Sequence, residues 1–145
     1  PTVELAAHLR DILGLRQRYR VLLVGAGRIG AALANYPGFD ARGFDIAAVY
    51  DVDPSKVGML LDGLVVRSLD DLEHDLGDES AHIAVIGTPA EAAQAIADRL
   101  VKSGVRAILN FAPVALTVPS DVTVTNVNMA LELEALSFAL SRQQA

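Results

Sequence analysis

The sequence predicts an α/β domain built on a doubly wound, parallel β-sheet with flanking helices. Six short apolar segments are bounded by turn residues: Arg20–Val24, Asp45–Tyr50, Leu64–Arg67, His82–Ile86, Arg106–Phe111 and Val122–Val127. Three intervals between them have helical character: Arg28–Tyr36, Ser68–Asp75 and Ala90–Ser103. Apolar strands that alternate with helices are typical of a parallel sheet covered on both faces, and right-handed crossovers then give the doubly wound topology.

Both ends of the chain are predicted to be helical. Thr2 is placed to cap a first helix through Leu13, which Gly14 ends. The last helix, from Asn128 to about Arg142, has two apolar lines that face different sides: Met129, Leu133, Leu136 and Leu140 form one, and Leu131, Ala135 and Phe138 form the other. Such a helix needs contacts on two sides. A groove of its own domain and a second subunit both satisfy that need. Residues 1–127 are therefore interpreted as one domain, and 128–145 as its C-terminal helix.

Composition favours a single domain in the cytoplasm. The 145 residues are 52% hydrophobic and only 5% aromatic, so the core must be built from Ala, Val, Leu and Ile. No uninterrupted apolar run reaches the roughly 18 residues of a membrane span, and the first ten residues lack a signal-peptide pattern. Because there is no cysteine, disulfides, zinc–thiolate sites and thiol redox chemistry are excluded, and we predict no metal site.

The charge pattern argues against nucleic-acid binding by these residues alone. The net charge is −6, from 12 basic and 18 acidic residues. The basic residues are scattered, apart from a loose group near the N-terminus: Arg10, Arg16, Arg18 and Arg20. A DNA-facing patch is one interpretation of this group. The solvated face of a helix that leads into a strand is the favoured one, because an acidic domain is poorly suited to neutralising phosphates.

A glycine motif follows the first predicted strand and opens a helix. Gly25, Gly27 and Gly30 have the GxGxxG spacing, and Asp51 ends the second strand 21 residues after Gly30. We expect Gly25 to permit the tight turn, Gly27 to let the backbone approach a pyrophosphate, and Gly30 to allow close helix packing. The phosphates would face the helix N-terminus. Asp51 would accept hydrogen bonds from the adenosine ribose, which favours NAD over NADP. Asp53 competes for this role, but before Pro54 and Ser55 it is better interpreted as a turn residue or a helix cap.

Two further strand ends are expected at the same edge of the sheet, where ligands bind in open α/β folds. One is Gly87-Thr88-Pro89, and the other is Asn110-Phe111-Ala112-Pro113. A proline directly after a strand stops the ladder and fixes the loop. Such a loop is suited to form a rigid pocket wall. An ordinary connecting loop with no role in binding is an equally good interpretation.

No catalytic group is evident, and we predict that the chain is not an enzyme. A dehydrogenase usually needs a proton donor beside the nicotinamide. His8 and His74 lie on predicted helices, and His82 begins a strand at the opposite rim of the sheet. Tyr36, at the end of the helix that starts near Gly27, is the remaining hydroxyl to consider, and one tyrosine without a partner base is not an active site.

A series of segments resembles the NAD(H)-binding domain of the Rex family of redox-sensing transcriptional repressors. In order they are Gly25–Gly30, Ala34–Phe39, Arg42–Phe44, Asp51–Gly58, Thr88–Gln94, Ile108–Val114 and Glu132–Ser137. The stretch Ile-Leu-Asn-Phe-Ala-Pro-Val is far more specific than the glycine motif. The resemblance covers essentially the whole chain.

The resemblance implies a homodimer that reads the NADH/NAD⁺ ratio through rearrangement of its subunits and exchanges its C-terminal helix between them. It places Tyr36 near the nicotinamide and brings Asn128 and Met129 there from the partner subunit. It also implies that operator DNA is bound through a winged-helix domain that these residues do not contain. The remaining cofactor contacts expected within the matched segments are Arg28, Ile29, Val52 and Lys56.

One departure from the family concerns Asn128. The family usually has Asp there, and that Asp takes part in a charge and hydrogen-bond switch between redox states. The substitution puts this switch in question and leaves cofactor binding intact.

Two other functions remain open at this point. One is an NAD-dependent oxidoreductase subunit whose substrate domain is on another chain, which the missing proton donor disfavours. The other is a CoA-binding domain, which Asp51 disfavours because CoA carries a phosphate on its ribose.

Overall fold

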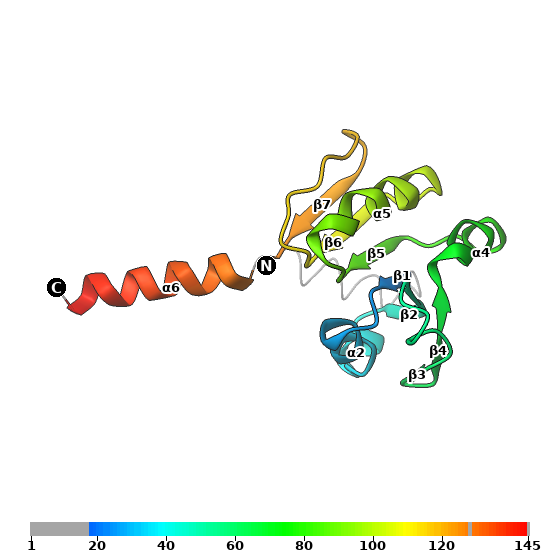
Figure 1. Ribbon diagram of the computed structural model, residues 1–145, viewed down its shortest axis with the longest axis horizontal. Helices are drawn as coiled ribbons and strands as arrows, with labels where there is room; N and C mark the ends of the chain where they lie inside the picture. The colour runs from blue at the N-terminus through cyan, green and yellow to red at the C-terminus, as the bar shows by residue number, and fades with distance from the viewer. Residues whose placement is uncertain (1–17, 128, 145) are drawn as a thin grey trace, which may run out of the picture.

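A seven-stranded sheet lies at the centre of the protein in the computed structural model, which describes residues 18–127 and 129–144 (Figure 1). The helix predicted over 2–13 and residue Asn128 lie outside the described residues. The strands are β1 (Tyr19–Val24), β2 (Phe44–Asp51), β3 (Leu60–Leu61), β4 (Leu64–Ser68), β5 (Ile83–Ile86), β6 (Ala107–Asn110) and β7 (Thr123–Asn126). All six predicted strands are confirmed, with ends that differ by one residue.

The strand order is β3-β4-β2-β1-β5-β6-β7, and every pair is parallel except β3 with β4. The chain therefore winds outward from β1 in one direction, returns, and winds outward from β5 in the other, as the doubly wound prediction requires. β3 was not predicted. It joins β4 through Asp62 and Gly63, whose φ angles are +48° and +82°. An Asp-Gly pair with both φ angles positive is a typical two-residue hairpin turn.

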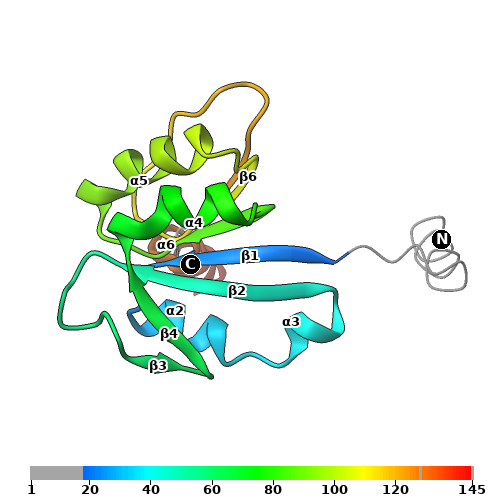
Figure 2. The same cartoon turned by 90° about the vertical axis from the view of Figure 1, so that its right-hand side faces the viewer.

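Helices cover the two faces of the sheet unequally. Figure 2 shows α4 (Leu72–Asp78) and α5 (Ala90–Lys102) on one side, and α2 (Arg28–Ala34) and α3 (Gly38–Ala41) on the other. Because side chains alternate along a strand, β1 contributes to both cores. Leu22 and Val24 pack in the core beneath α4 and α5, whereas Val21 and Leu23 face the side of α2.

Two of the predicted helices end differently from expectation. The predicted helix Arg28–Tyr36 is wrong at its C-terminal end, because α2 stops at Ala34 and a separate short helix, α3, begins at Gly38. Pro37 explains this break, since a proline disfavours helical geometry at the residue before it. The predicted helix Ser68–Asp75 is a 3₁₀ turn, Leu69–Asp71, followed by α4; the Ser68 side chain caps the turn by accepting a hydrogen bond from the Asp70 N–H.

The last helix, α6 (Met129–Gln144), projects away from the rest of the domain (Figure 1). Four of its large apolar side chains are uncovered: the exposed fractions of Leu133, Leu136, Phe138 and Leu140 lie between 58% and 65%. The interpretation in which this helix is wedged into a groove of its own domain is therefore wrong for this structure. The helix lies where a second molecule can reach it.

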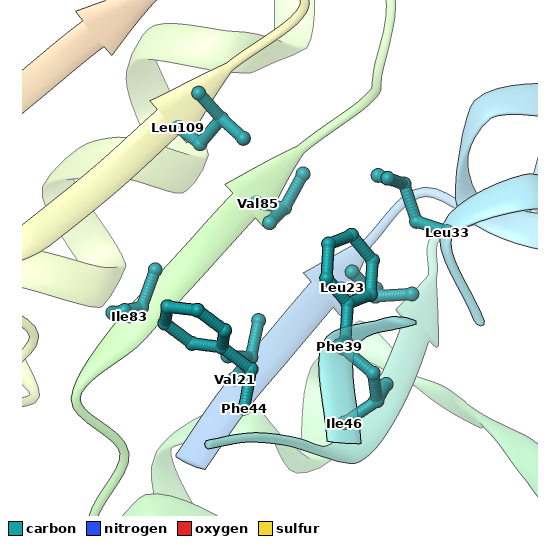
Figure 3. A pocket seen from close by; sticks show the side chains of 9 residues that line it. All are labelled: Val21, Leu23, Leu33, Phe39, Phe44, Ile46, Ile83, Val85 and Leu109. Carbon is teal, nitrogen blue, oxygen red and sulfur yellow. The ribbon is translucent and has the colours of Figure 1, made fainter. Parts of the chain in front are cut away.

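An apolar groove opens on the α2 side of the sheet. It has a volume of about 250 Å³, and Figure 3 shows the side chains that line it: Val21, Leu23, Leu33, Phe39, Phe44, Ile46, Ile83, Val85 and Leu109. The connection from β6 to β7 does not cover the groove, because its Ala112, Leu116 and Val118 pack in the core beneath α4 and α5. We call this feature the apolar groove.

The two described arginines of the basic N-terminal group are paired with acidic residues. Arg18 donates to both carboxylate oxygens of Asp45 and contacts Asp40. Arg20 forms an ion pair with Glu79 at 2.8 Å and donates to the Ser80 carbonyl. These contacts support the solvated, structural interpretation of Arg18 and Arg20. Arg10 and Arg16 lie outside the described residues.

Candidate functional site

The parallel register brings five strand ends to one edge of the sheet. Val24 lies beside Tyr50 and Ile86, Ile86 lies beside Asn110, and Asn110 lies beside Asn126. The segments that follow these residues therefore share one edge, which includes the glycine turn, Asp51, Gly87 and the loop after β6. Ligands bind at the carboxyl edge of open α/β sheets, near the point where the winding reverses. That point lies between β1 and β5.

The glycine turn is held tightly between two neighbouring strand ends. The Gly25 N–H donates to the Tyr50 carbonyl at 2.7 Å, and the Gly87 N–H donates to the Val24 carbonyl at 2.8 Å. Gly25 has a φ of +113°, and a Cβ atom there would lie 2.7 Å from the Gly87 carbonyl oxygen. Gly25 is thus required for its left-handed backbone and for close packing against Gly87.

The Asp51 side chain is hydrogen-bonded to the glycine turn. Its Oδ2 accepts a hydrogen bond from the Ala26 N–H at 2.7 Å, and its Oδ1 accepts one from the Asp53 N–H at 2.8 Å. The residue is 8% exposed. Each carboxylate oxygen can accept more than one hydrogen bond, so acceptor capacity remains on both. The carboxylate therefore shapes the turn and also places negative charge at the site.

Asp53 has a different role from Asp51. Its Oδ1 accepts hydrogen bonds from the N–H and the hydroxyl of Ser55, at 2.9 and 2.8 Å. These bonds lower the pKa of the Asp53 carboxyl below its usual value. The geometry matches the predicted turn residue.

The second glycine of the motif leaves open space at the turn. A Cβ atom on Gly27 would have a single neighbour within 4 Å, the Lys56 Nζ at 4.0 Å. Lys56 therefore brings an ammonium group next to the exposed backbone of the turn. Gly30, by contrast, packs against the Gly25 carbonyl and leaves no room for a Cβ atom, so its role is to allow the turn to close. An open glycine with a nearby cation is a suitable cradle for a phosphate group.

The loop after β6 is anchored by Asn110, which is fully buried. The Asn110 side chain donates to the Val114 carbonyl at 2.8 Å and accepts from the Ala112 N–H at 3.0 Å. Its amide is thus occupied within the protein. Phe111 is half-buried, whereas Pro113 and Val114 are exposed at the edge.

Some predicted site residues lie at the edge and others do not. Arg28, Ile29 and Val52 are exposed beside the glycine turn, and Thr88 and Pro89 follow β5. Tyr36 lies apart from them, because its ring packs edge-on against Phe39, whose ring packs edge-on against Phe44 at the start of β2. Asn128 and the Met129 side chain are outside what the structure describes. The predicted contacts with a cofactor stay predictions.

The two described histidines lie away from this edge, as expected. The His74 side chain is 81% exposed on α4. The His82 ring lies at the opposite end of the sheet, where its Nδ1 accepts a hydrogen bond from the Arg20 N–H. His8 is outside the described residues. Within residues 18–127 and 129–144 there is no group of His, Asp and Glu side chains that could hold a metal ion.

Two residues of the site were missed by the sequence reasoning. Tyr50 holds Gly25 through its carbonyl, and its buried hydroxyl donates to Asp75 at 2.7 Å. Burial and the Asp75 carboxylate raise the pKa of this hydroxyl, so it remains a donor. Asn126 accepts a hydrogen bond from the Asn110 side chain at 2.9 Å. The sequence feature that could have identified Asn126 is its position at the end of a predicted strand, which matches the position of Asn110 at the end of the preceding strand.

Together, the strand order, the glycine turn and the acidic residue at the end of β2 define a Rossmann-type nucleotide-binding domain. Residues 16–114 match the family model described as the CoA binding domain. The redox-sensing transcriptional repressor Rex of Desulfitobacterium hafniense is 44% identical over 142 residues, which are 98% of this chain and 68% of the relative. Rex of Streptomyces coelicolor is 49% identical over 131 residues, 90% of this chain and 51% of the relative.

Solved structures give the same answer. RSP, a Rex-family repressor of known structure, is 35% identical over 97% of this chain. Its complex with NADH matches with a TM-score of 0.84 and is covered over 68% of its length. Its complex with NAD⁺ and operator DNA matches with a TM-score of 0.88 and is covered over 65% of its length. The chain belongs to the Rex family, within the CoA-binding domain family. It spans about half the length of the Streptomyces coelicolor relative and about two thirds of the Desulfitobacterium hafniense relative.

Two predictions can be assessed here, one from the family assignment and one from the described helices. These relatives are named as repressors, which agrees with the expectation that the chain is not an enzyme. No helix in the described part of the chain is long and apolar enough to cross a membrane.

Proposed function

We propose that this chain is the NAD(H)-binding, redox-sensing domain of a Rex-type transcriptional repressor in the cytoplasm. The observation that carries the proposal is the glycine turn, which Tyr50 and Asp51 hold in place and which is open at Gly27. Such a turn fits a pyrophosphate, with Lys56 as a nearby cation. The complexes of RSP with NADH and NAD⁺ support the same ligand. Bound NAD(H) would supply a redox-dependent charge on the nicotinamide, and the protein would read that difference.

Asp51 is proposed to set cofactor choice. Its carboxylate can accept hydrogen bonds from ribose hydroxyl groups in addition to the two that it accepts from the backbone. A 2′-phosphate would remove a donor and bring a second negative charge close to Asp51. The 3′-phosphate on the ribose of CoA meets the same obstacle. NADH is therefore favoured over NADPH and over CoA.

Titration of NADH and NADPH tests this proposal. The sequence has no tryptophan, so nicotinamide emission can be followed directly. We expect the unmodified chain to prefer NADH at least tenfold, which corresponds to about 1.4 kcal/mol, and Asp51→Asn to narrow that ratio. Asp53→Asn is the matched control, because an asparagine oxygen can accept the same two hydrogen bonds from Ser55. A ratio that changes only in the Asp53 variant would refute the ribose assignment.

We further propose that the functional unit is a homodimer in which α6 of each subunit covers the apolar groove of the other. The two surfaces complement each other: α6 exposes Leu133, Leu136, Phe138 and Leu140, while the groove is lined only by apolar side chains. Exposed apolar patches of this kind usually mark an interface. This arrangement also supports the exchange of the C-terminal helix that the family resemblance implies.

Light scattering on two matched variants of α6 tests the dimer. Leu136→Glu places a carboxylate on the apolar surface, and Gln143→Glu places one near the end of the same helix. We expect the first variant to be monomeric or aggregated and the second to remain dimeric. An unmodified chain that is a well-behaved monomer would contradict the proposal.

A further inference from the structure

One buried side chain connects the loop after β6 to the strand end from which α6 departs. Asn110 is 0% exposed, and its planar amide makes three hydrogen bonds. Its Nδ2 donates to the Val114 carbonyl at 2.8 Å and to Asn126 Oδ1 at 2.9 Å, and its Oδ1 accepts from the Ala112 N–H at 3.0 Å. The amide orientation is fixed, because only an oxygen can face the Ala112 N–H.

The groups on the two sides of this amide belong to different parts of the protein. Ala112 and Val114 are in the loop that borders the proposed cofactor site. Asn126 is the last residue of β7, and it lies in register with Asn110 at the end of the neighbouring strand. The Val127 N–H donates to the Asn110 carbonyl at 2.8 Å, and α6 begins two residues later at Met129. A single residue thus holds the pocket loop and the base of α6.

We propose that Asn110 is a positioning residue that couples the pocket loop to the base of α6 through Asn126. This inference rests on the proposed function. A planar amide cannot follow a moving loop and keep its bond to Asn126 unless Asn126 moves with it. Asn126 itself is exposed, but the Asn110 amide has no exposed surface of its own, and a buried polar group left unpaired is costly. Cofactor contacts at the loop are therefore transmitted to the helix that would join the subunits.

Variants at Asn126 separate this coupling from the pocket itself. Asn126→Ala removes the acceptor and leaves the bonds from Asn110 to Val114 and Ala112 in place. Asn126→Asp keeps an acceptor oxygen, so it serves as the conservative rescue. Thr125→Ala is the matched control, because Thr125 is an exposed neighbour in the same strand.

The measurement is the dimer dissociation constant with and without saturating NADH, together with NADH affinity. By linkage, any effect of NADH on dimerisation equals the effect of dimerisation on NADH affinity, and typical couplings are roughly 5- to 150-fold. We expect a coupling of this size in the unmodified chain, in Thr125→Ala and in Asn126→Asp. The Asn126→Ala variant should still bind NADH, but its coupling factor between NADH binding and dimerisation should be close to one.

The outcomes that would overturn the inference are distinguishable from failure of the proposed function. If the unmodified chain binds no NADH or forms no dimer, the proposed function fails and this inference fails with it; if it does both and NADH leaves the dimer dissociation constant unchanged, only the inference fails. If the unmodified chain responds and Asn126→Ala responds equally, the proposed function stands and Asn110 does not carry the coupling.

Discussion

Replacing Asp51 by Asn should destabilise the fold through the glycine turn, independently of any cofactor. The two carboxylate oxygens of Asp51 accept hydrogen bonds from the Ala26 and Asp53 N–H groups. An asparagine offers one oxygen and one NH₂ group, so one of these N–H groups would face another donor. Because Asp51 is 8% exposed, water cannot readily take the place of the lost acceptor.

The magnitude follows from that geometry. Leaving a buried donor unsatisfied costs about 1–3 kcal/mol. For a domain of this size, such a loss lowers Tm by roughly 3–10 °C. Asp53→Asn should change the free energy of unfolding much less than Asp51→Asn does, because an asparagine oxygen keeps both hydrogen bonds from Ser55. The two variants carry the same change of charge, so their difference isolates the hydrogen bonds.

Thermal and urea unfolding, followed by far-ultraviolet circular dichroism without cofactor, measure both variants. The reasoning requires Asp51→Asn to be the less stable of the two by at least about 1 kcal/mol. Equal unfolding free energies would refute it, because the carboxylate would then not hold the turn.

Three further predictions concern other contacts. Gly25→Ala should lower Tm and abolish NADH binding, because the new Cβ would meet the Gly87 carbonyl. Gly104→Ala is the control: Gly104 has a φ of +103° and no atom near its Cβ, so this variant should show only the backbone strain of about 1–3 kcal/mol. The Glu73 carboxylate accepts from Arg99 on α5, which holds the pKa of Glu73 at about 2. Because this pKa is depressed from 4.5, the contribution of the pair is present above pH 4.5 and is lost as the pH falls toward 2. Both side chains are partly exposed, so Glu73→Gln should remove at most about 1 kcal/mol, measured as unfolding free energy against pH. Gly38→Ala should displace the Tyr36 ring, because the new Cβ would lie 2.6 Å from it. Loss of the contact between Tyr36 and Phe39 should lower the free energy of unfolding by less than about 1.5 kcal/mol. Unchanged nuclear magnetic resonance shifts of Tyr36 and Phe39 would contradict this prediction.

Local patterns were sufficient for much of the fold. Alternation of apolar segments with helices predicted the parallel sheet, and the sequence GAGRIG between a strand and a helix predicted the turn at Gly25. These features depend on neighbouring residues, whose steric and hydrogen-bonding preferences act over a few positions. The hairpin β3–β4 was missed because a two-residue strand is too short to show a period. The break after α2 was missed because the apolar pattern continues through Tyr36 while Pro37 stops the helix.

The site depended on contacts between segments that are distant in the chain. The chain pattern alone was enough to identify the residues at the strand ends, and therefore to predict that Gly25, Asp51, Gly87 and Asn110 share one edge. The folded structure was needed to establish that the Asp51 carboxylate bonds to Ala26, that Tyr36 rests against Phe39, and that Asn110 bridges Val114 and Asn126. It also decided that α6 leaves its own domain while an apolar groove stays open. Local patterns do not contain this information, because the direction of a side chain and the partner it reaches are set by the packing and register of several elements at once.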